Sequence, residues 1–340
     1  MKKIIAIICA LTLVLALAAC GGSSAPASAP TEAPAADAPA EAPVEAVVYN
    51  VGICQLVQHV ALDAASQGFQ DKLTELLDGN VNFNYQNASG DPATCAVIVN
   101  QFVSDDVDLI MANATASLQA AAAATNQIPV LGTAITAYNV ALDIPADEWP
   151  GYSGTNISGT SDLPPLDEQA AMLAEWFPVD EYPNVGLIYC SGEPNSIYQV
   201  TVVGAELKAM GYTVIDYSFA DSNDLSAVVT NACSECDVLY VPTDNTAAAA
   251  TETINNIAQP AGVPIIAGEE GICQGCGVAT LSISYYDLGV ATAEMAYEIL
   301  VNGADVSTME IGYAPVTAKY NPAMCEALGI TPLEGYEAIA

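Results

Sequence analysis

Short apolar runs alternate with segments of helical spacing along most of the chain. Runs such as residues 47–53 and 107–111 are typical of strands that are buried on both faces. From Leu62 to Leu76, by contrast, apolar residues recur every three or four positions, which predicts an amphipathic helix. This strand–helix order continues to Gly132 and predicts a parallel sheet with helices on both faces.

A polar stretch rich in glycine and proline, around residues 155–167, interrupts the pattern before it starts again. A long predicted helix, residues 288–300, then ends at Asn302-Gly303, which is typical of a helix C-cap. The sequence therefore predicts an α/β protein of two similar lobes, each a doubly wound parallel sheet. The strands predicted in the second lobe are residues 185–189, 213–219, 237–241, 264–268 and 279–283.

The start of the chain has a different pattern. Lys2 and Lys3 precede an apolar stretch that ends in small residues, which predicts a signal peptide over residues 1–19, with an uncleaved anchor as the alternative. The ending Leu-Ala-Ala-Cys resembles a bacterial lipobox and implies a diacylglycerol group on Cys20. Residues 20–46 contain no aromatic residue and no lysine, so we expect a lipidated flexible linker.

Charge narrows the choice of ligand. The chain has a formal net charge of −35, with 40 acidic and five basic residues, and all five are lysines. Nucleic acid is excluded as a partner because no cationic groove can form, and arginine forks for anionic metabolites are absent. The electrostatic field favours neutral, zwitterionic or cationic small molecules.

Polar side chains follow the predicted strands at their carboxyl ends, where doubly wound sheets bind ligands. Hydroxyl groups and helix N–H groups there can hold a carboxylate, and Asp244 or Glu269 can hold an ammonium group. Tyr138 and Tyr285 are candidates for a wall against the ligand side chain. The alternative is that these residues only cap helices or pack. The candidate ligand-binding residues are Gln55, Asn113, Thr115, Thr136, Tyr138, Ser191, Asn195, Ser196, Asp244, Asn245, Glu269 and Tyr285.

Several strings carry a resemblance to a known family: "VGICQLVQHVALDAASQGFQDKL", "NISGTSDL", "GLIYCSGEPNS", "YVPTDNT" and "ISYYDLGVATAEMA". With them the chain resembles the solute-binding lipoproteins of ABC transporters, in particular the aromatic amino acid (tryptophan-type) branch. The resemblance implies a type I periplasmic-binding-protein fold whose lobes are joined by a three-crossover hinge. It assigns residues 47–156 plus 285–306 to the N-terminal lobe and residues 157–284 plus 307–340 to the C-terminal lobe.

The resemblance also implies a function. The expected protein is an extracytoplasmic, membrane-anchored receptor that captures a small zwitterionic solute, an amino acid with an aromatic or branched apolar side chain. It would deliver this solute to an ABC permease and its ATPase, with no cofactor and no catalysis. Two alternatives remain: a sugar or nucleoside receptor of the same fold, and a two-lobed, cysteine-dependent racemase-type enzyme that uses Cys54 and Cys190 across the cleft.

His59 is the only histidine of the chain and follows the first predicted strand. No nucleophile elbow, phosphate loop or second histidine accompanies it, so we expect a structural or cleft-lining role.

Eight cysteines fall within the predicted lobes. An even number outside the cytoplasm favours disulfides or free thiols over a metal site. Cys54 and Cys190 are expected to face the cleft from opposite lobes, either reduced or buried as small apolar residues. The weaker alternative is a Cys₄ zinc site made of Cys233, Cys236, Cys273 and Cys276.

Overall fold

The computed structural model describes residues 47–339, so the predicted signal peptide, Cys20 and the linker lie outside the described residues. The first sheet has six strands, and all of its strand pairs are parallel. In spatial order they are β11 (Gly312–Tyr313), β5 (Ile157–Ser161), β4 (Val130–Ile135), β3 (Leu109–Asn113), β1 (Tyr49–Gln55) and β2 (Val81–Asn87).

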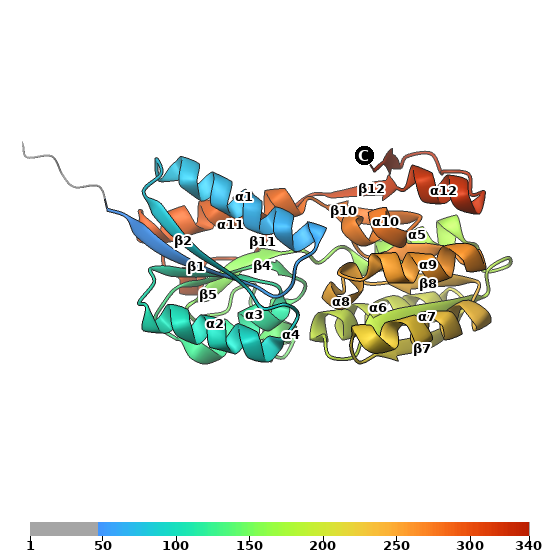
Figure 1. Cartoon of the computed structure of the whole chain (residues 1–340), viewed down its shortest axis with the longest axis horizontal. Coiled ribbons are helices and arrows are strands. Elements are labelled where there is room, and N and C mark those ends of the chain that lie inside the picture. Colours follow the sequence, from blue (N-terminus) through green and yellow to red (C-terminus); the bar gives the residue numbers. More distant parts are fainter. Residues whose placement is uncertain (1–46, 340) are drawn as a thin grey trace, which may run out of the picture. The chain divides into compact units, whose positions relative to one another are not determined.

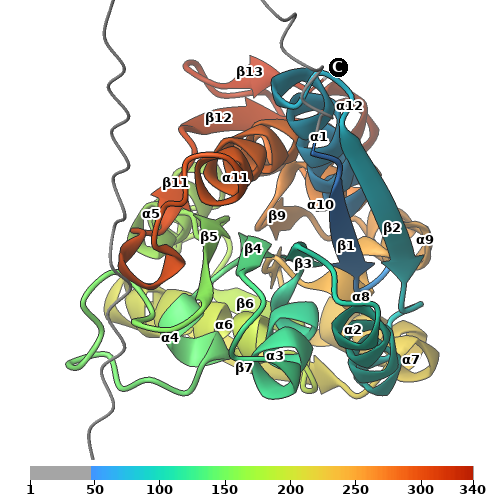
Figure 2. The same ribbon diagram turned by 90° about the vertical axis from the view of Figure 1, so that its left-hand side faces the viewer.

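Helices cover both faces of this sheet, and together they form what we call the first lobe. α1 and α11 cover one face of the sheet, and α2 and α3 cover the other (Figures 1 and 2). Val51 and Ile53 of β1 are buried against α1 and α11, whereas the sulfur of Cys54 contacts Ser117 of α3. Alternate side chains of a strand point to opposite faces, so a strand buried on both sides is apolar throughout. The helices are α1 (Val60–Leu76), α2 (Pro92–Ser104), α3 (Thr115–Ala124), α4 (Tyr138–Ala141) and α11 (Tyr285–Leu300).

The second sheet has seven strands and forms the core of the second lobe. Its pairs are parallel except for β12, which runs antiparallel to β10. In spatial order they are β13 (Glu337–Ala338), β12 (Val316–Tyr320), β10 (Ala279–Ile283), β9 (Ile265–Ala267), β8 (Val238–Val241), β6 (Asn184–Cys190) and β7 (Thr213–Phe219).

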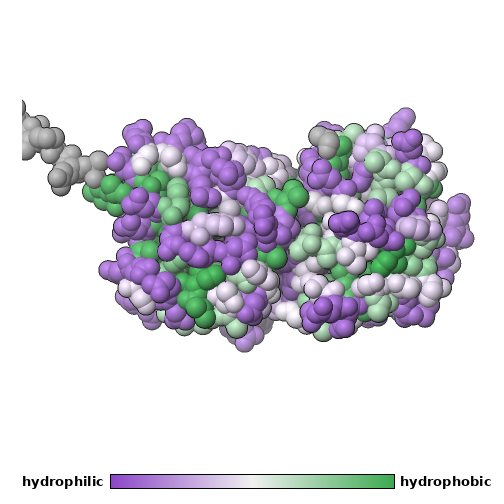
Figure 3. Space-filling model, viewed as in Figure 1, coloured by the Kyte–Doolittle hydropathy of each residue, from purple (hydrophilic) through white to green (hydrophobic). Residues whose placement is uncertain are grey.

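The buried clusters place α5, α6 and α12 on one face of the second sheet and α7, α9 and α10 on the other. No helix within residues 47–339 is long and apolar enough to cross a membrane. Hydrophilic residues predominate on both lobes in the view of Figure 3, and apolar residues form small separate areas. The bounds are α5 (Leu166–Trp176), α6 (Pro194–Ala209), α7 (Ser222–Glu235), α8 (Asn245–Ala248), α9 (Thr251–Ala261), α10 (Glu270–Cys276), η1 (Val306–Thr308) and α12 (Pro322–Leu328).

The predicted fold class, two lobes built on doubly wound, largely parallel sheets, is confirmed. The strand pairing differs from the predicted division of the chain at two segments. β5 pairs with β4 and β11 pairs with β5, so both belong to the first sheet and not to the second lobe. The chain therefore leaves the first sheet after Ser161 and again after Tyr313. The rest of the predicted division stays a prediction.

The polar composition of β5 explains why it was not expected in a sheet. Its backbone pairs like that of any strand, and its buried hydroxyl groups find partners on neighbouring elements. The hydroxyl of Thr160 lies 3.2 Å from that of Thr133 and 2.9 Å from that of Thr292. Hydroxyl groups that pair with one another can be buried without the cost of an unpaired polar group.

Two glycines let α1 and α11 touch through their backbones. A Cβ atom at Gly289 would lie 2.0 Å from the carbonyl oxygen of Ala65, and one at Gly68 would lie 2.2 Å from that of Tyr286. An added Cβ atom would therefore overlap the carbonyl oxygen at either position. A backbone oxygen cannot move away by changing a side-chain rotamer, so only glycine fits at these two positions. This close contact holds α11, which follows β10 of the second sheet, against the first lobe.

We therefore expect Gly289→Ala to lower the free energy of unfolding by about 1–3 kcal/mol, the range of an overpacked core. Gly192→Ala is the matched control, because a Cβ atom there would meet only the sulfur of Cys190 at an ordinary 3.8 Å. Urea denaturation measures both variants. Equal stability of the two would contradict the close helix contact.

Candidate functional site

Carboxyl ends of strands from both lobes face one cleft, with a volume of ≈ 500 Å³. The first lobe contributes residues that follow β1 and β2 and the first turns of α3, and the second lobe contributes residues that follow β6 and β7 and the start of α8. Contacts of α4 with α6 and of α1 with α10 also join the lobes (Figure 1). The lining residues that matter below are Ala116, Cys190, Glu193, Asn195, Asn245 and Thr246.

Glu193 organises the second-lobe wall of the cleft. Its carboxylate accepts hydrogen bonds from the backbone and side chain of Asn245 (2.9 and 2.7 Å) and of Thr246 (2.9 and 2.8 Å). Asn195 donates a further bond at 3.2 Å. One buried carboxylate therefore ties the loop after β6 to the start of α8. Glu193 is not among the predicted site residues, because its partners Asn245 and Thr246 lie about fifty positions further along the chain.

Asp244 lies directly before α8 and caps it. Its carboxylate accepts from the backbone N–H of Cys190 at 2.6 Å and from that of Ala247 at 2.8 Å. Burial, followed by repulsion from Glu193, raises the pKa of Asp244 to about 8. Like-charged carboxylates in a dry site cannot both ionise without cost, so a cation would be stabilised beside them.

A second polar network lies at the ends of β1 and β3 in the first lobe. Gln55 donates to Asp63 at 2.7 Å and accepts from the hydroxyl of Ser66 at 2.6 Å. Asn113 donates from Nδ2 to the backbone oxygen of Leu62 (2.8 Å) and to Ser66 (2.9 Å). The Oδ1 atom of Asn113 is buried and has no hydrogen-bond partner. The network thus fixes the orientation of the Asn113 amide and leaves its Oδ1 atom able to accept a hydrogen bond from a ligand.

Two further buried acids lie where the chain passes between the sheets. Asp162 follows β5 and accepts from the hydroxyl of Tyr285 at 2.7 Å and from that of Thr136 at 3.1 Å. Glu269 precedes α10 and accepts from the backbone N–H groups of Gly271 and Ile272 at 2.6 and 2.5 Å.

Both acids have raised pKa values. Burial raises the pKa of Asp162. Burial, together with the nearby charge of Asp162, raises the pKa of Glu269 to about 7. Thr136, Glu269 and Tyr285 are among the predicted site residues, but Asp162 is not, because it stands in a polar stretch without an apolar pattern.

His59 makes a contact between the lobes. It precedes α1, and its Nε2 atom lies 3.3 Å from Oδ1 of Asn245. Burial lowers the pKa of His59, and this outweighs the opposing effects of Asn245, Glu193 and Asp63. The imidazole is therefore neutral at pH 7.

Not every predicted site residue lies at the cleft. Asn195 and Asn245 line it directly. Tyr138 is buried against β4 and β5, where its hydroxyl donates to the carbonyl oxygen of Gly132 at 3.0 Å. Gly132 and Gly159 leave the space for this ring, since a Cβ atom at either would lie within 2.5 Å of the Tyr138 hydroxyl.

The remaining candidates are at element starts. Thr115 and Ser196 are buried in the first turns of α3 and α6. Ser191 is exposed, and its hydroxyl donates to the backbone oxygen of Phe219 at 3.1 Å. The assignment of these residues to ligand binding stays a prediction.

The cysteines are not arranged as expected. Cys54 does not face Cys190 across the cleft, because its Sγ atom lies on the opposite face of β1 from Gln55, 3.6 Å from the Ser117 hydroxyl. Cys190 does line the cleft. All eight cysteines within residues 47–339 are free thiols, and no group of three or more potential metal ligands gathers there. The Cys₄ alternative therefore has no support in this part of the chain.

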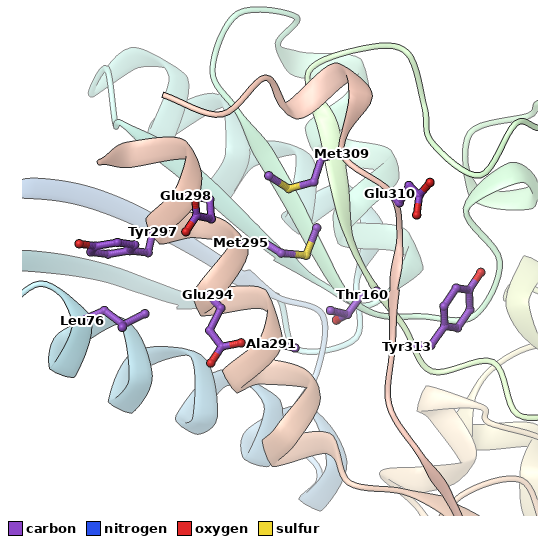
Figure 4. Close-up of a pocket in the computed structure, with 11 residues that line it drawn as sticks. Leu76, Thr160, Ala291, Glu294, Met295, Tyr297, Glu298, Met309, Glu310 and Tyr313 are labelled. Carbon is purple, nitrogen blue, oxygen red and sulfur yellow. The ribbon is translucent and has the colours of Figure 1, made fainter. Parts of the chain in front are cut away.

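A larger hollow of ≈ 660 Å³ lies on the first lobe, between α11 and residues 309–313 (Figure 4). Met295 and Met309 form part of its lining, with Glu294, Glu298 and Glu310 at its rim. None of the predicted site residues lines it. Volume alone does not make it the functional site, and the convergence of strand ends favours the smaller cleft.

The chain is similar to known proteins over most of its length. The family of ABC transporter substrate binding proteins matches residues 50–334. The chain is 35% identical over 271 residues to a protein of Clostridioides difficile named tyrosine-binding protein, covering 79% of this chain and 75% of that protein.

Solved structures extend the comparison. A domain from Streptococcus pneumoniae in complex with L-Trp is 29% identical, with a TM-score of 0.79, and 86% of this chain covers all of it. The ligand-free, open form of a Clostridium difficile substrate-binding protein with adhesive properties is 34% identical, with a TM-score of 0.64, and 86% of this chain covers 99% of it.

Because the chain has a single histidine, the pKa of His59 can be measured directly by NMR. Because burial lowers the pKa of His59, its imidazole should titrate below the ordinary midpoint of about 6.5 in the folded protein and near that midpoint in urea. Above the unfolded-state pKa of His59, the contribution of this histidine to the free energy of unfolding is fully present. As the pH falls below that value, the unfolded chain binds a proton more readily than the folded protein does, so this contribution is lost.

His59→Asn should remove this part of the pH dependence of stability. The exposed neighbour Gln58, changed to Asn, is the control. A folded-state midpoint at or above 6.5 would contradict the buried contact.

Proposed function

Because this chain belongs to the family of ABC transporter substrate-binding proteins, we propose that it captures an amino acid with an aromatic side chain outside the cytoplasm. The relatives supply the ligand class, since one is named for tyrosine and another holds L-Trp. The proposed site is the cleft between the lobes together with the polar groups buried directly behind its walls.

The open acceptor of Asn113 is the observation that carries this proposal. A buried oxygen without a partner costs free energy, on the order of 1–3 kcal/mol, until a donor reaches it. An α-ammonium group is such a donor, and it carries the positive charge that the buried acids lack. The two salt bridges within residues 47–339, Lys72 with Glu75 and Lys319 with Glu270, do not involve Asp162, Glu193, Asp244 or Glu269. A ligand cation therefore suits this site.

The other end of an amino acid needs hydrogen-bond donors. Thr115 and Ala116 begin α3, and Ala116 lines the cleft, so backbone N–H groups at this helix start can receive a carboxylate. Residues of the second lobe close the opposite side. The pairing of acid and helix start suits a zwitterion better than a neutral sugar.

Lobe closure follows from contacts that both lobes make with the ligand. The hydrogen bond between His59 and Asn245 spans the cleft and belongs to the closed arrangement. The L-Trp complex superposes better on this structure than the open relative does, even though the open relative is more similar in sequence. This order supports a closed, ligand-competent arrangement.

The transport of the amino acid across the membrane would be carried out by partner proteins. The predicted lipid on Cys20 and the linker of residues 20–46 would hold the receptor at the membrane beside an ABC permease and its ATPase. Opening of the lobes on the permease would release the amino acid. The racemase alternative loses its basis, because Cys54 and Cys190 do not oppose each other, and the relatives are binding proteins.

The test is calorimetric titration with L-tryptophan, L-tyrosine, L-leucine, D-glucose and adenosine. We expect the aromatic amino acids to bind and Asn113→Ala to weaken them about tenfold, the effect of one lost hydrogen bond in a buried site. Asn100→Ala, on the exposed face of α2, is the matched control and should bind as the wild type does. Binding of glucose or adenosine alone, or full affinity in Asn113→Ala, would contradict the proposal.

A further inference from the structure

Cys54 and Cys95 lie side by side in the first lobe, behind the wall of the cleft. Cys54 is in β1, and Cys95 is in the first turns of α2, which packs on β1. Both side chains are fully buried. The hydroxyl of Ser117 lies 3.6 Å from the Cys54 sulfur and 3.5 Å from the Cys95 sulfur, so one oxygen bridges the two thiols.

We propose that Cys54 and Cys95 are a redox-modification site, at which a peroxide converts the two thiols to a disulfide that joins β1 to α2. Both sulfurs contact the same Ser117 hydroxyl, and each thiol shifts the pKa of the other. This proposal is independent of the amino acid ligand, since neither thiol is assigned to ligand binding.

The two thiols have different roles because their protonation differs. The neighbouring Cys54 side chain, assisted by Ser117, lowers the pKa of Cys95 to about 7, whereas the neighbouring Cys95 and burial raise the pKa of Cys54. A thiolate is the form that attacks an oxidant. Cys95 is therefore the attacking sulfur, and Cys54 is the resolving thiol.

The reaction balances in two steps. The Cys95 thiolate attacks one oxygen of hydrogen peroxide, the O–O bond breaks, and a sulfenic acid and hydroxide form. The Cys54 sulfur then attacks the Cys95 sulfur and the S–O bond breaks. The hydroxide takes the Cys54 proton to give one water, and the leaving hydroxyl takes the proton released when Cys95 ionised to give the other. Two thiols and one peroxide give one disulfide and two waters.

The remaining cysteines do not share this arrangement. Burial raises the pKa of each of their thiols, so they are poor nucleophiles. The Cys236 sulfur has the hydroxyl of Tyr217 as its partner at 3.8 Å, and the Cys276 sulfur has the backbone oxygen of Ile272 at 3.4 Å. The thiols with raised pKa values are Cys190, Cys233, Cys236, Cys273, Cys276 and Cys325.

The proposed location outside the cytoplasm would expose Cys54 and Cys95 to oxidants. Proteins outside the cytoplasm meet oxidants and lack the reducing systems that keep cytosolic thiols free. A bond between Cys54 and Cys95 closes a loop of about 40 residues, which stabilises the fold by restricting the unfolded chain. The loop contains α1 and the segment after β2 that lines the cleft.

The test treats the folded full-length chain with hydrogen peroxide, blocks remaining thiols and maps peptides under non-reducing conditions. We expect a peptide pair joined through Cys54 and Cys95 that dithiothreitol separates, and a rise of about 5 °C in melting temperature. Cys54→Ser and Cys95→Ser should each lose the cross-link and the rise. Cys325→Ser, a buried thiol of the second lobe, should keep both.

Three results would overturn the proposal. One is that Cys54 and Cys95 both remain free after peroxide treatment of the folded wild type. Another is that Cys95 is oxidised to a sulfinic acid without a cross-link. The third is that either cysteine pairs instead with a thiol of the second lobe. All three are read from wild-type protein, so they stand even if a serine variant fails to fold.

Discussion

The structure depends on how buried carboxylates are satisfied in a chain that has almost no cations. Arginine is absent, and the three lysines within residues 47–339 make no salt bridge with Asp162, Glu193, Asp244 or Glu269. Glu193, Asp244 and Glu269 therefore take backbone N–H groups as partners, and Asp162 takes two hydroxyl groups. Each of these acids fixes a loop or a helix start in the course of being satisfied. The shape of the second-lobe wall is thus a consequence of its electrostatics.

The same constraint bears on the charge of the solute that we propose. Backbone and hydroxyl donors satisfy hydrogen-bonding capacity but leave the negative charge uncompensated in a dry environment, and the raised pKa values of Asp244 and Glu269 follow from this. An anionic solute would add to the repulsion. A solute that brings an ammonium group relieves it, which agrees with relatives that bind tyrosine and tryptophan.

Sequence patterns predicted the elements well where side chains determine them. The apolar runs at β1, β3 and β8 gave buried strands, and the asparagines at positions 113, 195 and 245 lie at strand ends or helix starts as expected. β5 could not be predicted in this way, because its sequence, Ile-Ser-Gly-Thr-Ser, has no apolar pattern and its place depends on backbone pairing with β4.

Hydrogen bonds between residues far apart in the chain also could not be predicted from the sequence. Glu193 and Asp162 act through partners that only the fold brings near. The error over Cys54 had a different cause, since neighbouring residues of a strand point to opposite faces. Once Gln55 is placed on the face of α1, Cys54 must face α2, and strand parity alone would have shown this.

The central claim is that buried, partly protonated acids receive the ammonium group of an amino acid. Proton linkage measures this directly, by titrating L-tryptophan at pH 7 calorimetrically in two buffers with different ionisation enthalpies. If the ammonium group lowers the pKa of Asp244 and Glu269 from about 8 and about 7, binding releases protons and the observed enthalpy differs between the buffers. Identical enthalpies in both buffers, or an uptake of protons, would contradict the account.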